Sequence, residues 1–164
     1  SLLQLSEVTI RNGAGATIAS SSITGSSTCS SYPSHESPIR ACDGSTGTKF
    51  LCFDGVPTDL VATFATPQSV SWYDLTTAND ADNRDPTNWT LECRSADDAA
   101  WVLLDEQHLS SSEVPTARYT AYGLATLDSP ADVSCCRWTA SGECGSNVTK
   151  ECTRMPRWSS ISLD

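Results

Sequence analysis

The residues best suited to bind a metal ion lie in a short glycine-rich loop. Asp43 opens the stretch Asp43-Gly44-Ser45-Thr46-Gly47-Thr48, and Thr48 follows it by five residues. Ca²⁺ takes roughly six to eight oxygen ligands from carboxylates, hydroxyls and backbone carbonyls, and a tight loop with an acid at its mouth brings such oxygens together. We therefore expect a structural Ca²⁺ at Asp43, Ser45 and Thr48. The alternative is that Asp43 caps its own turn by accepting hydrogen bonds from backbone N–H groups.

No arrangement of residues in the sequence predicts catalysis. The two histidines are His35, in a Ser- and Pro-rich stretch, and His108. The chain contains no G-x-S-x-G, H-E-x-x-H or P-loop motif. A glycosidase needs two acids across a cleft, whereas adjacent acids such as Asp97-Asp98 and Asp105-Glu106 point apart on a short strand or turn. We expect a protein that is not an enzyme.

The cysteines indicate an oxidising compartment. Their number is even and no C-x-x-C pair is present, so disulfides are favoured over a zinc site, with connectivity that the sequence leaves open. The eight positions are Cys29, Cys42, Cys52, Cys93, Cys135, Cys136, Cys144 and Cys152. Two sequons, at Asn88 and Asn147, predict N-glycosylation, although each asparagine is equally compatible with being unmodified. Together these features predict a secreted, extracellular protein.

Length and charge limit the kinds of partner. The chain has 164 residues, with 10 Lys and Arg against 20 Asp and Glu, for a net charge of −10. This length fits one domain over residues 1–164, and 38% apolar content supports a hydrophobic core. Nucleic acid is disfavoured as a partner because its binding requires cations that neutralise phosphates. No apolar run approaches the roughly 20 residues of a membrane-spanning helix.

Short apolar runs predict an all-β protein. Ser, Thr, Gly, Pro and Asp interrupt these runs at the spacing typical of a sandwich or barrel. The expected strands cover residues 2–10, 60–64, 70–75, 89–93, 101–104, 119–127, 135–139 and 159–163, and residues 16–23 are expected to pair back on the first strand. Residues 20–37 read as a polar loop, with Pro67 closing the strand over 60–64 and a Cys-rich insertion over 141–156.

One irregularity is predicted in the first strand. Leu3 and Leu5 share one face of a regular strand, while Val8 and Ile10 share the other. Such a strand cannot bury both pairs in a single core. A bulge near Ser6-Glu7 reconciles them and places Glu7 at the kink, where ligands often bind.

A series of motifs runs through nearly the whole chain in a recognisable order. The most specific is Thr76-Thr77-Ala78-Asn79-Asp80-Ala81-Asp82-Asn83-Arg84-Asp85-Pro86, which is followed by Trp89-Thr90-Leu91-Glu92. The others are Leu5-Ser6-Glu7-Val8, Asp43 to Phe50, Asp98 to Asp105, and Arg137-Trp138. Together they resemble the galactose-binding-like domains of the discoidin or coagulation factor 5/8 type C superfamily, which includes modules of the CBM32 type. The resemblance implies a jelly-roll β-sandwich of two antiparallel sheets.

The sequence departs from the superfamily pattern chiefly at cysteines. Cys52 and Cys93 stand where the pattern has Asp and Gly, Cys135-Cys136 replaces two aromatic residues, and Phe50 replaces Trp. This sandwich is therefore expected to be stapled by disulfides, each of which contributes roughly 2–4 kcal/mol. Because Cys42 and Cys52 flank one loop, we predict that they pair.

The resemblance also implies a structural calcium in the loop that begins at Asp43, closed by a glutamate from a terminal strand. Ser160 stands where many relatives carry that glutamate, whereas Glu7 is able to supply a carboxylate. The expected calcium ligands are therefore Asp43, Ser45, Thr48 and Glu7. In the segment from Asn79 to Asp85 we instead expect Arg84 and the acids to form a hydrogen-bonded corner, since their spacing does not match an EF-hand.

Two functions follow from the resemblance. Relatives commonly bind glycans through loops at one end of the sandwich, which suggests a Ca²⁺-dependent, lectin-like adhesion module with a glycan site at Tyr32, His35, Arg40 and Asn83. The other function is a self-associating structural component of an extracellular fibre, coat or matrix, with copies of itself or other extracellular proteins as partners. We prefer the second, because carbohydrate-binding modules are usually attached to another domain. The apolar start, Leu2-Leu3, also suits addition to the sheet edge of a neighbouring copy, or completion of its own sheet.

Overall fold

The computed structural model describes residues 2–127 and 132–141. Within them the chain forms β-strands joined by turns and short 3₁₀ helices. The strands are β1 (Leu3–Leu5), β2 (Glu7–Arg11), β3 (Ile23–Ser27), β4 (Phe50–Cys52), β5 (Thr58–Gln68), β6 (Trp72–Thr76), β7 (Asn88–Arg94), β8 (Val102–His108), β9 (Ala121–Thr126) and β10 (Val133–Ser141). The 3₁₀ helices are η1 (Ser20–Ser22), η2 (Ser34–Glu36), η3 (Pro38–Ala41) and η4 (Asp82–Arg84).

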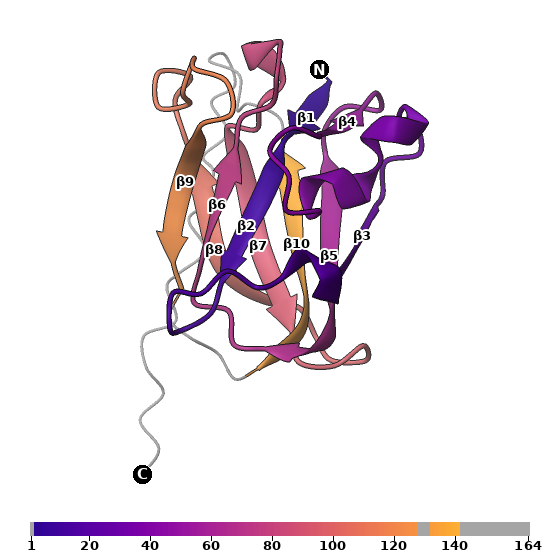
Figure 1. The fold of residues 1–164 in the computed structure, drawn as a ribbon, viewed down its shortest axis with the longest axis vertical. Helices are drawn as coiled ribbons and strands as arrows, with labels where there is room; N and C mark the ends of the chain where they lie inside the picture. Colours follow the sequence, from indigo (N-terminus) through magenta and orange to yellow (C-terminus); the bar gives the residue numbers. More distant parts are fainter. Residues whose placement is uncertain (1, 128–131, 142–164) are drawn as a thin grey trace, which may run out of the picture.

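Two antiparallel sheets make the sandwich. The larger has the order β3-β5-β10-β7-β8, and the smaller has the order β2-β6-β9 and lies across it in Figure 1. A third, two-stranded sheet joins β1 to β4, in which Leu3 pairs with Cys52. The predicted all-β sandwich is confirmed, and the first strand completes a sheet within its own chain. No helix among the described residues is long and apolar enough to span a membrane.

The core is built by alternation along the strands. In β5 the buried apolar residues are Leu60, Ala62 and Phe64, which share one face because side chains alternate between faces. Trp89 is buried on β7, and its indole N–H donates to the Tyr73 hydroxyl at 2.7 Å across the space between the sheets. This bond satisfies the polar end of the buried tryptophan.

The predicted irregularity in the first strand is confirmed at Ser6. β1 ends at Leu5 and β2 begins at Glu7, and between them the Ser6 backbone N–H donates to the Thr76 carbonyl at 3.0 Å. The break allows Leu3, Leu5, Val8 and Ile10 all to be buried. It also leaves Glu7 as the first residue of a strand that faces the 43–48 loop.

The fold differs from the prediction in several places. Residues 16–22, expected to begin a strand that pairs back, are joined to β2 by an isolated bridge between Thr17 and Arg11. β3 lies inside the predicted polar loop, where a β-carbon on Gly25 would come within 2.8 Å of Ile39 Cα, so the close approach of η3 requires glycine there. Pro67 lies within β5 rather than after it, close to a register shift in the pairing with β10. The predicted strand over 159–163 and the insertion over 141–156, apart from Ser141, lie outside the described residues.

The predicted Cys42–Cys52 pair is wrong. Cys52 is joined to Cys29, with their Cα atoms 5.9 Å apart, because the backbone around Ser31 pairs with the end of β4 and brings Cys29 to it. A second disulfide joins Cys93 to Cys136, which face each other across β7 and β10. Cys42 and Cys135 are buried and form no disulfide with another cysteine of the described residues, so the expectation that they are crosslinked stays a prediction. Cys144 and Cys152 lie outside the described residues. The two disulfides are consistent with an extracellular protein.

Candidate functional site

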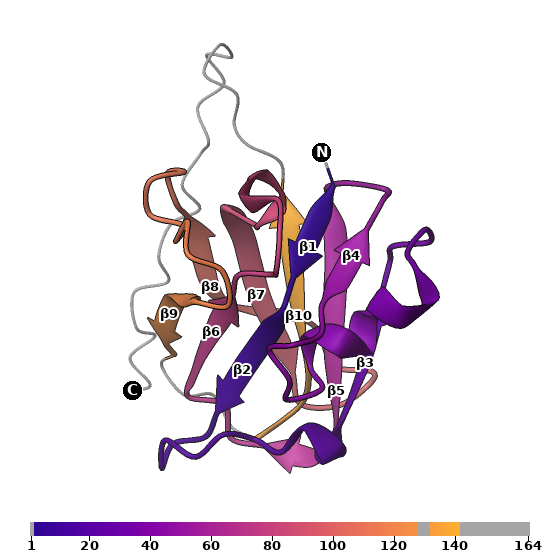
Figure 2. The ribbon, with the colours of Figure 1, turned by 45° about the horizontal axis from the view of Figure 1, so that its top comes forward.

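A cavity of about 170 Å³ lies among loops at one end of the sandwich. The segment that follows β6, the loop that precedes β9 and the start of the chain gather at this end (Figure 2). The cavity, called here the first cavity, is lined by His35, Glu36, Gly47, Thr48, Lys49, Asn79 and Tyr119. It therefore combines an aromatic ring with hydrogen-bonding side chains from four separate segments.

Thr77 positions the aromatic residue of this cavity. Its backbone N–H donates to the Thr120 carbonyl at 3.0 Å, and its own carbonyl accepts from the Tyr119 N–H at 3.2 Å. The Thr77 hydroxyl donates to the Ala117 carbonyl and accepts from the Thr120 N–H, both at 3.0 Å. These bonds hold Tyr119 at a φ of 58°, in the left-handed region, with 52% of the residue exposed. A strained and exposed tyrosine on a fixed backbone is typical of a functional position.

The side chain of Arg118 anchors the same loop. Its guanidinium donates to both carboxylate oxygens of Asp85, at 2.7 and 2.9 Å, and to the Ala78 carbonyl at 2.7 Å. The Asp85 side chain is 0% exposed, and its burial raises its pKa while Arg118 opposes that change. Arg118, rather than the predicted Arg84, therefore makes the hydrogen-bonded corner of the motif that ends at Asp85.

Lys49 links three segments beneath the first cavity. Its side chain is 8% exposed, and Nζ lies 2.8 Å from Asp80 Oδ1, 3.7 Å from Glu36 Oε1 and 3.4 Å from Gln4 Oε1. The hydrogen bond from Lys49 holds the pKa of Asp80 below its usual range. Two carboxylates thus offset one ammonium group, so the cavity carries no excess of positive charge.

The residues predicted to bind glycan are placed separately. His35 lines the first cavity, and Asn83 lines a second cavity described below. Tyr32 packs edge-on against Phe50, with ring centroids 6.3 Å apart, and Arg40 forms an ion pair with Asp43 at 3.2 Å. The glycan-binding role of this set stays a prediction.

Sequence reasoning missed three residues of the first cavity. Lys49 and Asn79 lie within motifs shared with the superfamily, Lys49 at the end of the Asp43 loop and Asn79 in the segment before Pro86. Tyr119 was assigned to the start of a strand, whereas it precedes β9. The available signal was therefore position alone, since Lys49 directly precedes β4, Asn79 follows the end of β6, and Tyr119 lies shortly before β9.

The predicted calcium ligands gather at the junction of β2 and the 43–48 loop. The Thr48 hydroxyl lies 2.9 Å from both carboxylate oxygens of Asp43, and the Ser45 N–H donates to Asp43 at 3.0 Å, so the turn-capping role of Asp43 is observed. The same N–H lies 3.2 Å from Glu7 Oε2. Burial raises the pKa of Glu7 to about 7, hydrogen bonds from Gly44 and Ser45 partly oppose this, and the Asp43 charge adds to it.

These oxygens fit a hard cation. Two carboxylates and a threonine hydroxyl lie around one loop, and Glu7 is 7% exposed with no ion pair to a basic side chain among the described residues. A buried carboxylate without a cationic partner is unfavourable. A bound cation would relieve that cost, and oxygen donors of this type suit Ca²⁺.

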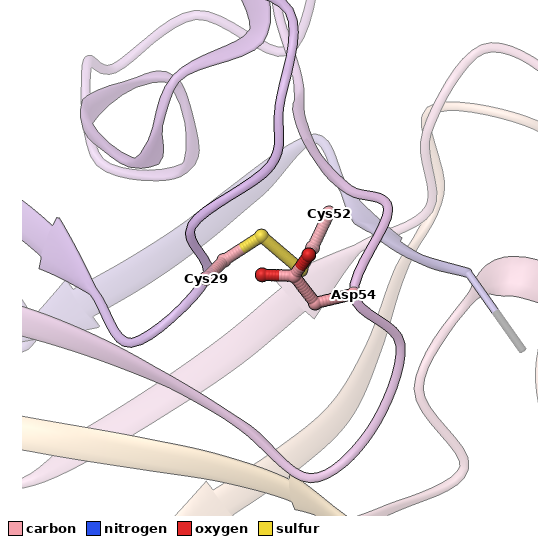
Figure 3. Close-up of side chains that lie close together, drawn as sticks. All are labelled: Cys29, Cys52 and Asp54. Carbon is pink, nitrogen blue, oxygen red and sulfur yellow. A yellow bond between two sulfur atoms is a disulfide. The ribbon is translucent and has the colours of Figure 1, made fainter.

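A different group of side chains has the spacing of a metal site but not its chemistry. Cys29, Cys52 and Asp54 lie close together (Figure 3), with ligand atoms within 4.8 Å of one another. The two sulfur atoms are joined in a disulfide, and metals bind thiolates. Asp54 instead accepts hydrogen bonds from the backbone N–H groups of Ser30 and Ser31, which hold its pKa below the usual range. This group is structural.

The asparagine of the first sequon is largely buried. Asn88 is 9% exposed at the start of β7, and its side-chain oxygen lies 3.2 Å from His108 Nδ1. An N-linked sugar is attached to the side-chain nitrogen, which this contact does not involve, so glycosylation of Asn88 stays a prediction. Asn147 lies outside the described residues.

Comparison with solved structures identifies the fold. A family 32 carbohydrate-binding module of Clostridium perfringens NanJ, solved in complex with galactose, aligns with a TM-score of 0.62 at 20% identity, over 84% of this chain and 90% of that one. This chain has the galactose-binding-like fold of family 32 carbohydrate-binding modules. No protein-family model matches the chain, and no curated protein matches it.

Two further modules from the same organism agree. A family 32 module in complex with GalNAc-β-1,3-galactose aligns with a TM-score of 0.62 at 11% identity, over 77% of this chain and 88% of that one. The module CBM32-3 of a family 31 glycoside hydrolase aligns with a TM-score of 0.61 at 16% identity, over 75% and 80%. These neighbours are carbohydrate-binding modules rather than components of fibres or coats. The comparisons therefore favour the lectin-like alternative over the self-associating one.

Proposed function

We propose that this protein is a non-catalytic, extracellular module that binds glycans in the first cavity. The observation that carries the proposal is the half-exposed Tyr119 ring, fixed at a cavity that it shares with His35, Asn79 and Lys49. The fold shared with the sugar-bound modules supports it. Disulfides on that fold support the extracellular location.

The chemistry of the first cavity suits a neutral hexose. A sugar ring offers an apolar C–H face to an aromatic side chain and hydroxyls to surrounding donors and acceptors. Tyr119 offers the aromatic face. The His35 imidazole and the Asn79 amide offer hydrogen bonds, whereas the Lys49 ammonium is already held by buried or neighbouring oxygens. Because Glu36 and Asp80 offset the charge of Lys49, an anionic sugar gains little here.

Calcium is proposed as a structural partner of this site. Asp43, Ser45, Thr48 and Glu7 would hold the ion. It would supply the positive charge that the buried Glu7 carboxylate lacks, since Asp43 already pairs with Arg40. Thr48 hydrogen-bonds to Asp43 and also lines the first cavity, so an ordered loop fixes one wall of the sugar site. Thermal melts in Ca²⁺ and in chelator test this part, since Ca²⁺ should raise the melting temperature of the wild type and not that of Asp43→Asn.

Titration with a panel of neutral hexoses, galactose and GalNAc included, tests the glycan proposal. We expect binding that is millimolar or tighter, followed by calorimetry or NMR, and a loss of about tenfold in Tyr119→Ala, because an aromatic contact is worth about 1 kcal/mol or more. Tyr32→Ala is the matched control, since that ring packs on Phe50, and it should keep wild-type affinity. Binding of no sugar, or equal affinity in Tyr119→Ala, would contradict the proposal.

A further inference from the structure

A second cavity lies beside the first, and it is larger. Its volume is about 450 Å³, within the range of roughly 300–1,000 Å³ that is usual for ligand sites. The first cavity, at about 170 Å³, is below that range and has room for little more than one sugar ring. A ligand that used only the first cavity would leave the larger one empty.

Two chain segments run from one cavity into the other. Asn79 lines the first cavity, and Asp82 and Asn83 on the same segment line the second; Tyr119 lines the first, and Thr116 on the same loop lines the second. Asn79 and Asp82 are three residues apart, as are Thr116 and Tyr119. Three residues span at most about 11 Å even when fully extended. The two cavities are therefore close to each other, and each of the two segments lines both.

The chain between Asn79 and Asp82 is called here the ridge, and buried side chains hold it in place. The side-chain amide of Gln4, which is fully buried, donates to the carbonyls of Asp80 and Ala81 at 2.5 and 2.9 Å. The Arg118–Asp85 ion pair fixes the loop on the other side. A ligand that crosses the ridge therefore meets a preformed surface, which lowers the entropy lost on binding.

The second cavity offers hydrogen bonds without cations or aromatic rings. Its polar side chains include the Asp82 carboxylate, the Asn83 amide and the hydroxyls of Thr87, Ser111 and Thr116, and Val114 adds an apolar patch. Asp82 and Asn83 are exposed at its mouth. Donors and acceptors of this kind suit a neutral ligand that carries many hydroxyl groups, whereas the Asp82 carboxylate repels an anion.

We propose that the two cavities are subsites of one extended site, which binds a neutral oligosaccharide whose terminal ring stacks on Tyr119 and whose chain crosses the ridge into the second cavity. This inference rests on the proposed function, and it names the ligand class as an oligosaccharide rather than a free monosaccharide. The terminal ring is held by stacking, and the following rings are held by hydrogen bonds to Asn83 and Thr116.

Calorimetry with galactose, lactose and lacto-N-tetraose tests the inference. We expect affinity to rise at least tenfold from the monosaccharide to the tetrasaccharide in the wild type. The double variant Asn83→Ala/Thr116→Ala should lose that gain and keep the wild-type affinity for galactose. Asp98→Asn is a control, since Asp98 is exposed in the β7–β8 hairpin at the opposite end of the strands. Melting curves confirm that each variant is folded.

The outcomes separate the two proposals. Equal affinity for all three sugars overturns the extended site and leaves the glycan-binding proposal standing. A length-dependent gain that survives in the double variant also overturns it, because the chain then leaves the first cavity in another direction. Failure of all three sugars and of the wider hexose panel overturns both proposals.

Discussion

The centre of the sandwich and its loop end are stabilised in different ways. At the centre, Trp89 and Leu91 pack between the sheets, and the Cys93–Cys136 disulfide crosslinks neighbouring strands. At the loop end, a few buried polar side chains hold the backbone through directed hydrogen bonds, above all Lys49 and Arg118. Apolar packing is spread over many contacts and tolerates small movements, whereas a directed bond is present or lost. The centre of the sandwich should therefore tolerate small structural changes, whereas the geometry of the candidate site depends on individual hydrogen bonds.

The largest expected effect is at the centre. Trp89→Ala should lower the free energy of unfolding by about 4–5 kcal/mol, since it leaves a cavity and removes the donor to the Tyr73 hydroxyl. Urea denaturation measures the change. Trp101→Ala is the matched control, because Trp101 is only half-buried, against Arg94 and Arg137, and should cost much less. If both variants lowered the free energy of unfolding equally, the packed centre would not be more important for stability than the periphery.

At the loop end, we expect a variant to lose less stability than Trp89→Ala and to lose more sugar binding. Arg118→Met should cost about 3 kcal/mol, because it leaves the Asp85 carboxylate buried and unpaired. It should also weaken sugar binding, since Tyr119 is the next residue. Denaturation and sugar titration measure the two effects. Adding Asp85→Asn should recover part of the stability, whereas a single variant with unchanged stability would show that the ion pair does not anchor the loop.

The smallest effect is a pH dependence at Glu7. Its pKa in the folded protein, about 7, lies above the ordinary value of 4.5, so the folded state holds the proton more tightly. In chelator, the free energy of unfolding should therefore fall by about 2–3 kcal/mol as the pH rises from about 4.5 to above 7. Urea denaturation across this range measures it, with Glu7→Gln as the control that lacks the change.

Calcium should oppose this trend, since it binds the deprotonated carboxylate. A wild-type profile in chelator that matches that of Glu7→Gln would mean that Glu7 is solvated rather than buried.

The sequence predicted what depends on local pattern. The break at Ser6 follows from two leucines and two β-branched residues on opposite faces of one strand, and the sandwich follows from the order of the motifs. The Cys29–Cys52 bond does not follow from spacing, because it depends on where the chain around Ser31 meets β4. β3 was missed because it has one buried apolar side chain, Ile23, and is held by backbone pairing with β5.

The site was predicted less well than the fold, for a related reason. Lys49, Asn79 and Tyr119 come from three segments that are distant in sequence, and no pattern within any one of them marks the residue as facing a cavity. Tyr119 is placed by its hydrogen bond to Thr77, and Lys49 is placed by its hydrogen bond to Asp80. Hydrogen bonds between distant segments leave no pattern in the sequence, whereas a strand leaves the alternation of apolar and polar residues.

The thiol of Cys42, which forms no disulfide with another cysteine of the described residues, can report loop motion. Burial, and then the neighbouring Glu7 and Asp43 charges, raise the pKa of this thiol, so the closed structure leaves it protonated and shielded from alkylating reagents. Alkylation at this position, located by peptide mass mapping, requires a local opening that exposes the thiol. The alkylation rate therefore measures how often this opening occurs. A ligand that stabilises the closed loop should lower that rate, and a tighter ligand should lower it more.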